Sequence, residues 1–170
     1  EKGRIIFSEI IPFREHSQRV RAADIMLDPL YYNSHTTGAP FVWQGVPVIT
    51  CPLINMGSRV GASLLSGVFN AESREKMSGM EESKEEFEHI LDDMIVKSAE
   101  QYVQKAVRLA TDTPRRLYLR RALLRLSHTS SLLDGQAKAK SVEGGVKMAV
   151  DLFHSVQHIS SPRGCESSLR

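Results

Sequence analysis

The amino-acid sequence predicts an α/β fold in which a parallel, Rossmann-like sheet carries helices on its faces. Two observations support this prediction: short apolar runs recur over the first 70 residues, and a helix-like segment follows each run. This alternation is typical of parallel strands joined by helical crossovers. The expected strands are residues 4–8, 24–28 and 47–51, and the expected helices are residues 14–23, 37–45 and 57–68.

Local signals support each of these elements in turn. Residues 4–8 are mostly β-branched or aromatic, which is typical of a buried strand, and Pro29 stops the second strand. Gly45 ends the second helix as a C-terminal glycine cap, and Pro52 closes the third strand. The third helix places four apolar side chains on one face. These side chains are Val60, Leu64, Leu65 and Val68.

The second half of the chain has a different pattern. Residues 71–86 are rich in charge, with four Glu between positions 81 and 86, and we expect an exposed stretch that is partly disordered or weakly helical. The whole charged insertion is expected to span residues 71–92. A last short strand is expected at residues 92–96, followed by helices at 98–110 and 114–126. Asp112 or Thr113 would cap the second of these helices.

Beyond that helix, Gly135 is expected in a loop, and residues 141–158 are expected to form a terminal helix. The predicted organisation therefore has four parts. They are a nucleotide-binding α/β core at 1–70, the charged insertion at 71–92, the final strand and C-terminal helices of the same lobe at 93–158, and a flexible tail at 159–170.

Composition excludes several classes of protein. The 170 residues carry 22 Lys and Arg against 20 Asp and Glu, and a net charge of +2 argues against a general nucleic-acid binder. No apolar run approaches the ~20 residues that a membrane-spanning helix needs. Cys51 and Cys165 suggest neither a disulfide framework nor a zinc site, so we expect a reducing compartment, the cytoplasm and nucleus. Because the chain opens without an initiator Met, we expect a piece of a longer protein.

The segment Ser34-His35-Thr36-Thr37-Gly38 is the strongest candidate site, because it lies between an expected strand and an expected helix. Ligands of doubly wound sheets bind beyond the carboxyl ends of the strands, where the next helix offers free backbone N–H groups. Two hydroxyls and an imidazole add donors that suit a diphosphate. The alternative is that the two threonines only cap the helix and the histidine is a solvated turn residue.

A second candidate site follows the first expected strand, on the same edge of the sheet. Phe13 and His16 could stack on a flat base, and Arg14 or Arg19 could meet an anion. The alternative is an ordinary helix start with charged side chains.

A longer series of residues resembles a known family. The series comprises Arg4-Ile5-Ile6-Phe7-Ser8, Pro12, Glu15, His16, Ala23-Asp24, Leu27-Asp28, Asn33, His35-Thr36-Thr37-Gly38, Trp43, Gly45, Pro47, Ser58-Arg59-Val60 and Ala62-Ser63. In this register it is similar to the C-terminal catalytic lobe of the nucleocytoplasmic protein O-linked N-acetylglucosamine transferases. The fucose-transferring relatives of the SPINDLY group resemble it less at the His-Thr-Thr-Gly segment. The resemblance implies a lobe of a GT-B glycosyltransferase.

The resemblance also implies roles for single residues. His35, Thr36 and Thr37 would bind the pyrophosphate of UDP, and His16 would pack on the uracil. The backbone near Ile11 would meet the uracil edge, with Arg19 close by.

Two positions depart from the family pattern. Phe13 stands where the family usually has Lys. Pro40 stands where the family usually has an acidic residue that reaches the ribose hydroxyls, and Pro40 has no side-chain acceptor. Both positions leave the nucleotide affinity and the donor sugar open.

The reaction implied by the resemblance is transfer of N-acetylglucosamine from UDP-GlcNAc to Ser or Thr hydroxyls of intracellular proteins, with inversion. No Asp-x-Asp motif stands near the nucleotide segment, which fits a metal-independent mechanism without a cofactor. The implied partners are a UDP-sugar, protein acceptors, an upstream catalytic lobe that holds the catalytic residues, and helical tetratricopeptide repeats. No nucleic acid or membrane partner is expected. Two alternatives remain: a sibling transferase that uses a GDP-sugar, and an inactive nucleotide-binding interaction module.

A cluster of arginines on one expected helix is interpreted as part of an ordinary exposed helix face. Five arginines cluster on the expected helix at 114–126, which suits an RNA or acidic-lipid patch. We expect instead a solvated helix face. The arginines are Arg115, Arg116, Arg120, Arg121 and Arg125.

Overall fold

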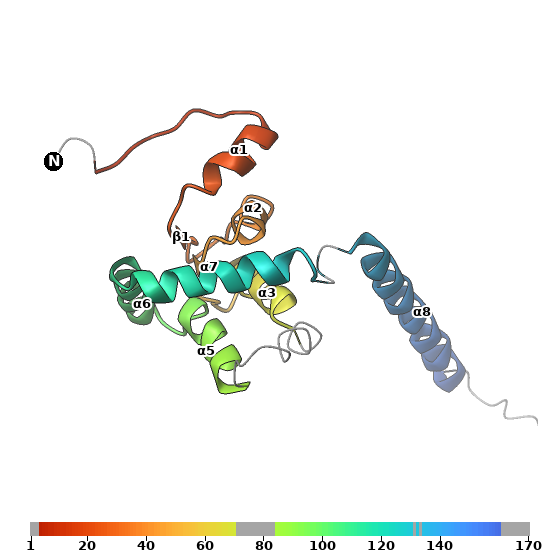
Figure 1. Cartoon of the computed structure of the whole chain (residues 1–170). Coiled ribbons are helices and arrows are strands. Elements are labelled where there is room, and N and C mark those ends of the chain that lie inside the picture. Colours follow the sequence, from red (N-terminus) through yellow and green to blue (C-terminus); the bar gives the residue numbers. More distant parts are fainter. Residues whose placement is uncertain (1–3, 71–83, 131, 133, 161–170) are drawn as a thin grey trace, which may run out of the picture. The chain divides into compact units, whose positions relative to one another are not determined.

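The structure is a computed structural model, and it describes residues 4–70, 84–130, 132 and 134–160. By their internal contacts, residues 1–133 and 134–170 form two separate compact units. The first unit contains the sheet and most of the helices, and the second contains one long helix (Figure 1).

A small parallel sheet lies at the centre of the first unit. Strand β1 (Met26–Leu27) pairs in parallel with β2 (Val48–Ile49), so that Met26 lies opposite Val48. A parallel bridge between Thr50 and Ile95 adds a third segment on the far side of β2. The expected α/β class with a parallel sheet is therefore confirmed.

The helices of the first unit lie around this sheet, whereas α8 belongs to the second unit (Figure 1). Their bounds are α1 Phe13–Val20, α2 Ala39–Trp43, the 3-10 helix η1 Met56–Ser58, α3 Val60–Val68, α5 Lys84–Met94, α6 Ala99–Thr111, α7 Thr113–Ser127 and, in the second unit, α8 Gly135–Ser160.

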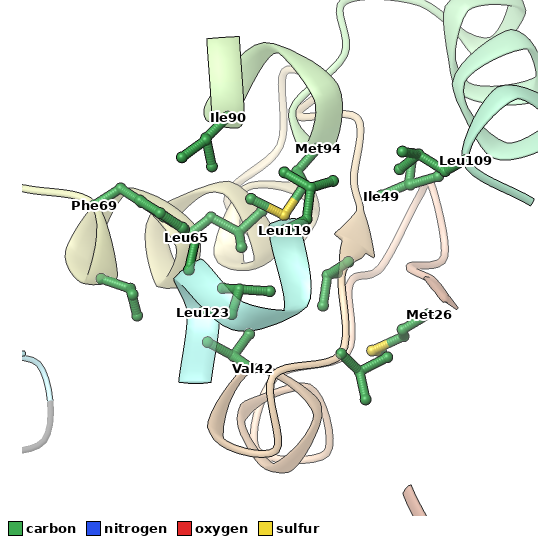
Figure 2. Close-up of a cluster of buried hydrophobic side chains, with 14 of the residues drawn as sticks. Met26, Val42, Ile49, Leu65, Phe69, Ile90, Met94, Leu109, Leu119 and Leu123 are labelled. Carbon is green, nitrogen blue, oxygen red and sulfur yellow. The ribbon is translucent and has the colours of Figure 1, made fainter. Parts of the chain in front are cut away.

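One hydrophobic core joins β2 to the helices of the first unit. Figure 2 shows side chains from α3, α5 and α7 converging on the strand. Burying such side chains contributes about 1.5–3 kcal/mol each, which makes this cluster the main source of stability. The residues at its centre, fully buried, are Val46, Ile49, Leu65, Val68, Ile90, Met94, Leu119 and Leu123.

Several local predictions are confirmed at the ends of helices. The carboxylate of Asp112 accepts the backbone N–H of Arg115 at 3.0 Å and so caps α7. Gly45 follows α2 with a left-handed φ of 72°. A Cβ at this glycine would lie 2.3 Å from Cγ of Leu124, so both conformation and space require glycine there.

The expected strand at residues 4–8 is wrong. In the structure this segment forms no strand, and the side chains of Ile5, Ile6 and Phe7 are exposed. A strand needs a neighbouring strand to pair its backbone and a face to bury its side chains. Among the described residues, no strand lies beside this segment.

The expected charged stretch runs into a helix. Residues 71–83 lie outside the described residues, but α5 covers Lys84–Met94 as a regular helix. Ile90 and Met94, four residues apart, share one face of this helix and are buried in the core. The strand expected at 92–96 is consequently reduced to the single bridge at Ile95.

The loop expected at Gly135 is also wrong, because α8 begins there. Asp134 provides the cap that this prediction missed: its carboxylate accepts the N–H groups of Gln136 at 2.9 Å and Ala137 at 3.1 Å. The boundaries of the four predicted parts stay predictions.

Candidate functional site

The proposed phosphate-binding segment lies in the loop that leaves the carboxyl end of β1. His35 is half-buried, and Thr36 and Thr37 are exposed in a turn. Helix α2 begins at Ala39, with Gly38 at its N-cap and no side-chain cap. The helix start expected near Thr36 or Thr37 is therefore wrong, and the threonine hydroxyls are not used for capping.

The reason for the later helix start is the tight turn ahead of it. The N–H of Gly38 donates to the carbonyl of His35 at 3.1 Å, which closes a turn over the two threonines. A Cβ at Gly38 would lie 2.3 Å from the carbonyl oxygen of Ser34, so only glycine fits this turn. The exposed hydroxyls of Thr36 and Thr37 are thus carried on a fixed turn.

The ring of His35 has a defined orientation. It stacks on Tyr32 with the ring centroids 4.6 Å apart and an interplanar angle of 16°. Its Nε2 lies 3.3 Å from the carbonyl oxygen of Gly57. A carbonyl only accepts, so Nε2 is the donor in this contact, and Nδ1 is the nitrogen left to meet a ligand.

Two buried polar residues, Asp28 and Asn33, hold the loop in place through hydrogen bonds. The carboxylate of Asp28 accepts the N–H of Ser34 at 2.7 Å and the hydroxyl of Thr50 at 2.8 Å. The side chain of Asn33 donates to the carbonyl of Pro29 at 2.8 Å and accepts the N–H of Gly61 at 3.0 Å. Sequence reasoning assigned neither side chain to the site. The signal for Asp28 is its place at the last position of an apolar run, directly before the loop.

The proposed uracil-binding residues lie on α1 and just before it. Nη2 of Arg19 lies 3.2 Å from Nδ1 of His16, and Nη1 of Arg19 donates to the carbonyl of Glu9 at 3.0 Å. Arginine only donates, so Nδ1 of His16 accepts and its Nε2 carries the proton. Ile11 is half-buried, whereas the Phe13 side chain is 73% exposed.

Helix α2 connects the two groups of proposed residues. The ring of His16 makes an edge contact with Phe41 of α2, with centroids 6.5 Å apart and an interplanar angle of 77°. Nε2 of Gln44, the residue that directly follows α2, donates to Oγ of Ser17 in α1 at 3.2 Å. The phosphate-binding turn leads directly into the same α2. Pro40 is buried in the first turn of α2, and its side chain has no polar atom that could bind a ligand.

The arginine cluster of α7 is only partly the solvated face that the sequence predicts. Arg115 contacts Asp93 at 2.6 Å, Arg116 contacts Asp24 at 3.3 Å, and Arg120 donates to the carbonyl of Ala23 at 3.0 Å. These three side chains bind other parts of the first unit, while Arg121 is exposed.

Metal ligands and thiols give no second candidate site among the described residues. Among the described residues, no three His, Cys, Asp or Glu side chains gather into a group that could hold a metal ion. Cys51 is a buried free thiol, and burial raises its pKa. None of the helices in the described part of the chain combines the length and the apolar character that crossing a membrane requires.

Comparisons with known proteins identify the family of this chain. Residues 1–142 match the model of glycosyl transferase family 41. The chain is 34% identical over 143 residues to a probable UDP-N-acetylglucosamine–peptide N-acetylglucosaminyltransferase of Arabidopsis thaliana, covering 84% of this chain and 13% of the relative. It is also 34% identical over 133 residues to the enzyme of that name from Caenorhabditis elegans, covering 78% of this chain and 10% of the relative.

A solved structure shares the fold. A mutant of the Thermobaculum terrenum O-GlcNAc transferase superposes with a TM-score of 0.63 at 24% identity, over 86% of this chain and 24% of that chain. The chain thus spans about a tenth of the length of the curated relatives and about a quarter of the solved structure. The family match extends over most of the chain and includes both groups of candidate residues, and we conclude that the chain belongs to glycosyl transferase family 41.

Proposed function

We propose that this chain is the UDP-binding part of a protein O-GlcNAc transferase, which transfers N-acetylglucosamine from UDP-GlcNAc to Ser or Thr hydroxyls of proteins. The observation that carries the proposal is the fixed turn after β1, which exposes the hydroxyls of Thr36 and Thr37 beside the oriented ring of His35. The names of the curated relatives support the same donor and the same class of acceptor.

The chemistry follows from the charge of the leaving group. The acceptor hydroxyl gives up its proton to a base that the upstream lobe would supply, and its oxygen attacks the anomeric carbon. The bond from that carbon to the diphosphate breaks, and UDP leaves with the bonding electrons. Negative charge therefore develops on the diphosphate. Donors held in place before the reaction stabilise that charge without reorganising. The hydroxyls of Thr36 and Thr37 would supply such donors. His35, whose Nε2 donates to the carbonyl of Gly57, would add one from Nδ1 when its ring carries both protons.

The uridine would bind on the α1 side. His16 would pack on the uracil, its ring held by Arg19 and by the edge contact with Phe41. The backbone near Ile11 would meet the edge of the base. The exposed ring of Phe13 stands where a cation is usual in the family, so this chain would contact the nucleotide there through an apolar surface.

The remaining parts of the proposal concern the whole protein. Transfer would proceed with inversion, without a metal ion or other cofactor, in the cytoplasm and nucleus. An upstream lobe would supply the catalytic residues and the acceptor site, and tetratricopeptide repeats would hold the protein substrate.

Calorimetric titration of the full chain with UDP and with uridine tests the proposal. Thr37→Val and His35→Ala should each remove a hydrogen bond to a charged group, which costs about 1.5–3 kcal/mol. That corresponds to a roughly ten- to hundredfold loss of UDP affinity. Uridine, which lacks the phosphates, should lose far less.

Thr111→Val at the end of α6 is the matched control and should leave both affinities unchanged. An equal loss for UDP and uridine in the two site variants would remove the phosphate assignment. Stronger binding of GDP than of UDP would favour the sibling transferase that uses a GDP-sugar. UDP binding without sugar transfer to a Ser/Thr peptide, measured in the full-length protein, would favour the inactive interaction module.

A further inference from the structure

Asp28 is an acidic residue in an unusual place. It follows β1 directly, it is 1% exposed, and its carboxylate is occupied at both oxygens. Oδ1 accepts the backbone N–H of Ser34 at 2.7 Å, and Oδ2 accepts the hydroxyl of Thr50 at 2.8 Å. Carboxylates are costly to bury unless hydrogen bonds compensate them. Oδ2 thus binds the residue that follows β2, and Oδ1 binds the loop that carries the candidate site.

The contact with Ser34 closes the loop of residues 28–34 upon itself. The neighbouring residue Asn33 connects the same loop to the segment that leads into α3. The backbone N–H of Asn33 donates to the carbonyl of Gly57 at 2.8 Å, and its Oδ1 accepts the N–H of Gly61 at 3.0 Å. The position of the Ser34 amide is therefore determined by two buried side chains, Asp28 and Asn33.

The carboxylate itself has no room to move toward α3. A Cβ at Gly61 would stand 2.3 Å from Oδ2 of Asp28 and 2.6 Å from Oγ1 of Thr50. On the loop side, the carbonyl of Ser34 lies so close to Gly38 that a Cβ there would approach it to 2.3 Å. Ser34 is thus held through its N–H by Asp28 and packed through its carbonyl against Gly38.

We propose that Asp28 is a positioning residue for the phosphate-binding turn. By accepting the N–H of Ser34, its carboxylate fixes the backbone position from which His35, Thr36 and Thr37 continue. The side chains of these three residues are then already in place before the nucleotide binds. A hydrogen bond to a carboxylate is roughly twice as strong as one between neutral groups, which suits this task. If the turn is already ordered in the free protein, the entropic cost of ordering it does not reduce the affinity for the nucleotide. The inference rests on the proposed function.

Three variants of the full chain separate positioning from mere support of the fold. Asp28→Ala removes both contacts. Asp28→Asn keeps an accepting oxygen for Ser34, while its amide group can donate to the hydroxyl of Thr50. Thr50→Val removes only the contact that does not involve the loop. Each variant is compared by hydrogen exchange of the backbone amides of residues 34–38 and by calorimetric titration with UDP and uridine.

Asp28→Ala should speed exchange of the turn amides and weaken UDP at least tenfold more than uridine. Asp28→Asn should restore most of the protection and of the preference for UDP. Thr50→Val should lower thermal stability while leaving the ratio of UDP to uridine affinity near that of the wild type. Should Asp28→Ala fail to fold, Asp28→Ser takes its place, because its side chain is too short to reach the Ser34 amide.

The outcomes distinguish this inference from the proposed function. Unchanged exchange at residues 34–38 in Asp28→Ala, or equal losses of UDP preference in Asp28→Ala and Thr50→Val, would overturn the positioning role. A wild-type chain that does not bind UDP would overturn the proposed function. In that case the exchange measurement still decides whether Asp28 orders the turn.

Discussion

The hydroxyl of Tyr102 in α6 donates a hydrogen bond of 2.9 Å to the backbone carbonyl of Asp28, 74 residues earlier in the chain. The contact joins α6 to the end of β1, at the residue whose side chain holds the loop. Burial of the phenol, helped by the nearby charges of Asp28 and Cys51, raises the pKa of Tyr102 to about 12. The neutral, donating form of this phenol is therefore maintained far into the alkaline range.

The first prediction concerns the alkaline titration of this phenol. The protein has four tyrosines, and an unperturbed phenol ionises near pH 10. Tyr102 should ionise last, in a separate late phase of the phenolate absorbance, and Tyr102→Phe should abolish that phase. A variant that kept the late phase would show that another tyrosine carries the raised pKa.

The second prediction concerns stability and its pH dependence at the same residue. Tyr102→Phe should lower the free energy of unfolding by about 1 kcal/mol, the usual contribution of one hydrogen bond. The folded-state pKa of Tyr102 is raised, so this stabilisation is complete below about pH 10 and is lost as the pH rises through about 12. Urea titrations of both proteins at several alkaline pH values measure the difference, which should shrink toward the upper end of that range.

The third prediction concerns Gly61, which faces the Asp28 carboxylate. Gly61→Ala should lower the free energy of unfolding by about 1–3 kcal/mol, because the new methyl group overlaps buried oxygens that cannot move. Gly67→Ala in the same helix is the matched control. There the nearest atom is Cδ1 of Leu132, 3.1 Å from the added Cβ, and a flexible side chain can yield. Equal losses in the two variants would contradict the overlap at Asp28.

The fourth prediction concerns Asp93 of α5, whose carboxylate contacts one side chain of α6 and one of α7. Its carboxylate contacts Nζ of Lys105 at 2.7 Å and Nε of Arg115 at 2.6 Å. Burial raises the pKa of Asp93, but the hydrogen bonds and charges of Lys105 and Arg115 outweigh it and hold the pKa below its ordinary value. Asp93→Asn should therefore cost about 1–3 kcal/mol of stability at neutral pH.

The sign of the pH dependence follows from the lowered pKa of Asp93. The stabilisation is present above the unfolded-state pKa, near pH 4, and is lost as the pH falls through the lower folded-state pKa. The gap between wild type and Asp93→Asn in denaturant titrations should thus close in acid. A gap that stays constant down to the acid transition would contradict the ion pairs as its source. Asp92→Asn, at the exposed neighbouring carboxylate, is the control.

The fifth prediction concerns Arg120, which reaches from α7 to the end of α1. Its guanidinium donates to the carbonyls of Ala23, at 3.0 Å, and of Arg21. Arg120→Met should speed hydrogen exchange of the α1 amides, since the chain after that helix loses its anchor. Arg121→Met, on the exposed side of the same helix, should leave α1 unchanged. Similar exchange in both variants would show that Arg120 does not fasten α1.

The sequence predicts best those features that depend on neighbours in the chain. Gly45 ends α2 and Asp112 caps α7, because a left-handed turn and a side-chain cap each need only a few residues. The strand at 4–8 fails for the opposite reason. Its apolar composition is right for a strand, but pairing requires a second strand that no local pattern specifies. Helix α5 was missed because its charge hides the spacing of Ile90 and Met94.

The candidate site shows the same division. The segment from His35 to Thr37 and its position after a strand were predicted from the sequence, whereas the late start of α2 was not, because it depends on the close approach of Gly38 to Ser34. The role of Asp28 depends on Thr50 and Gly61, which lie 22 and 33 residues away in the sequence and meet only in the fold.

The short helix α2 has a thermodynamic consequence for any nucleotide that the site accepts. The turn of Thr37 leads into one end of α2, and His16 contacts Phe41 in the same helix. A base held at His16 would therefore keep its own phosphates at a high effective concentration near the turn, since the turn leads into the same helix that His16 contacts. Uridine and inorganic pyrophosphate offered together as separate molecules should bind far more weakly than the two joined in UDP.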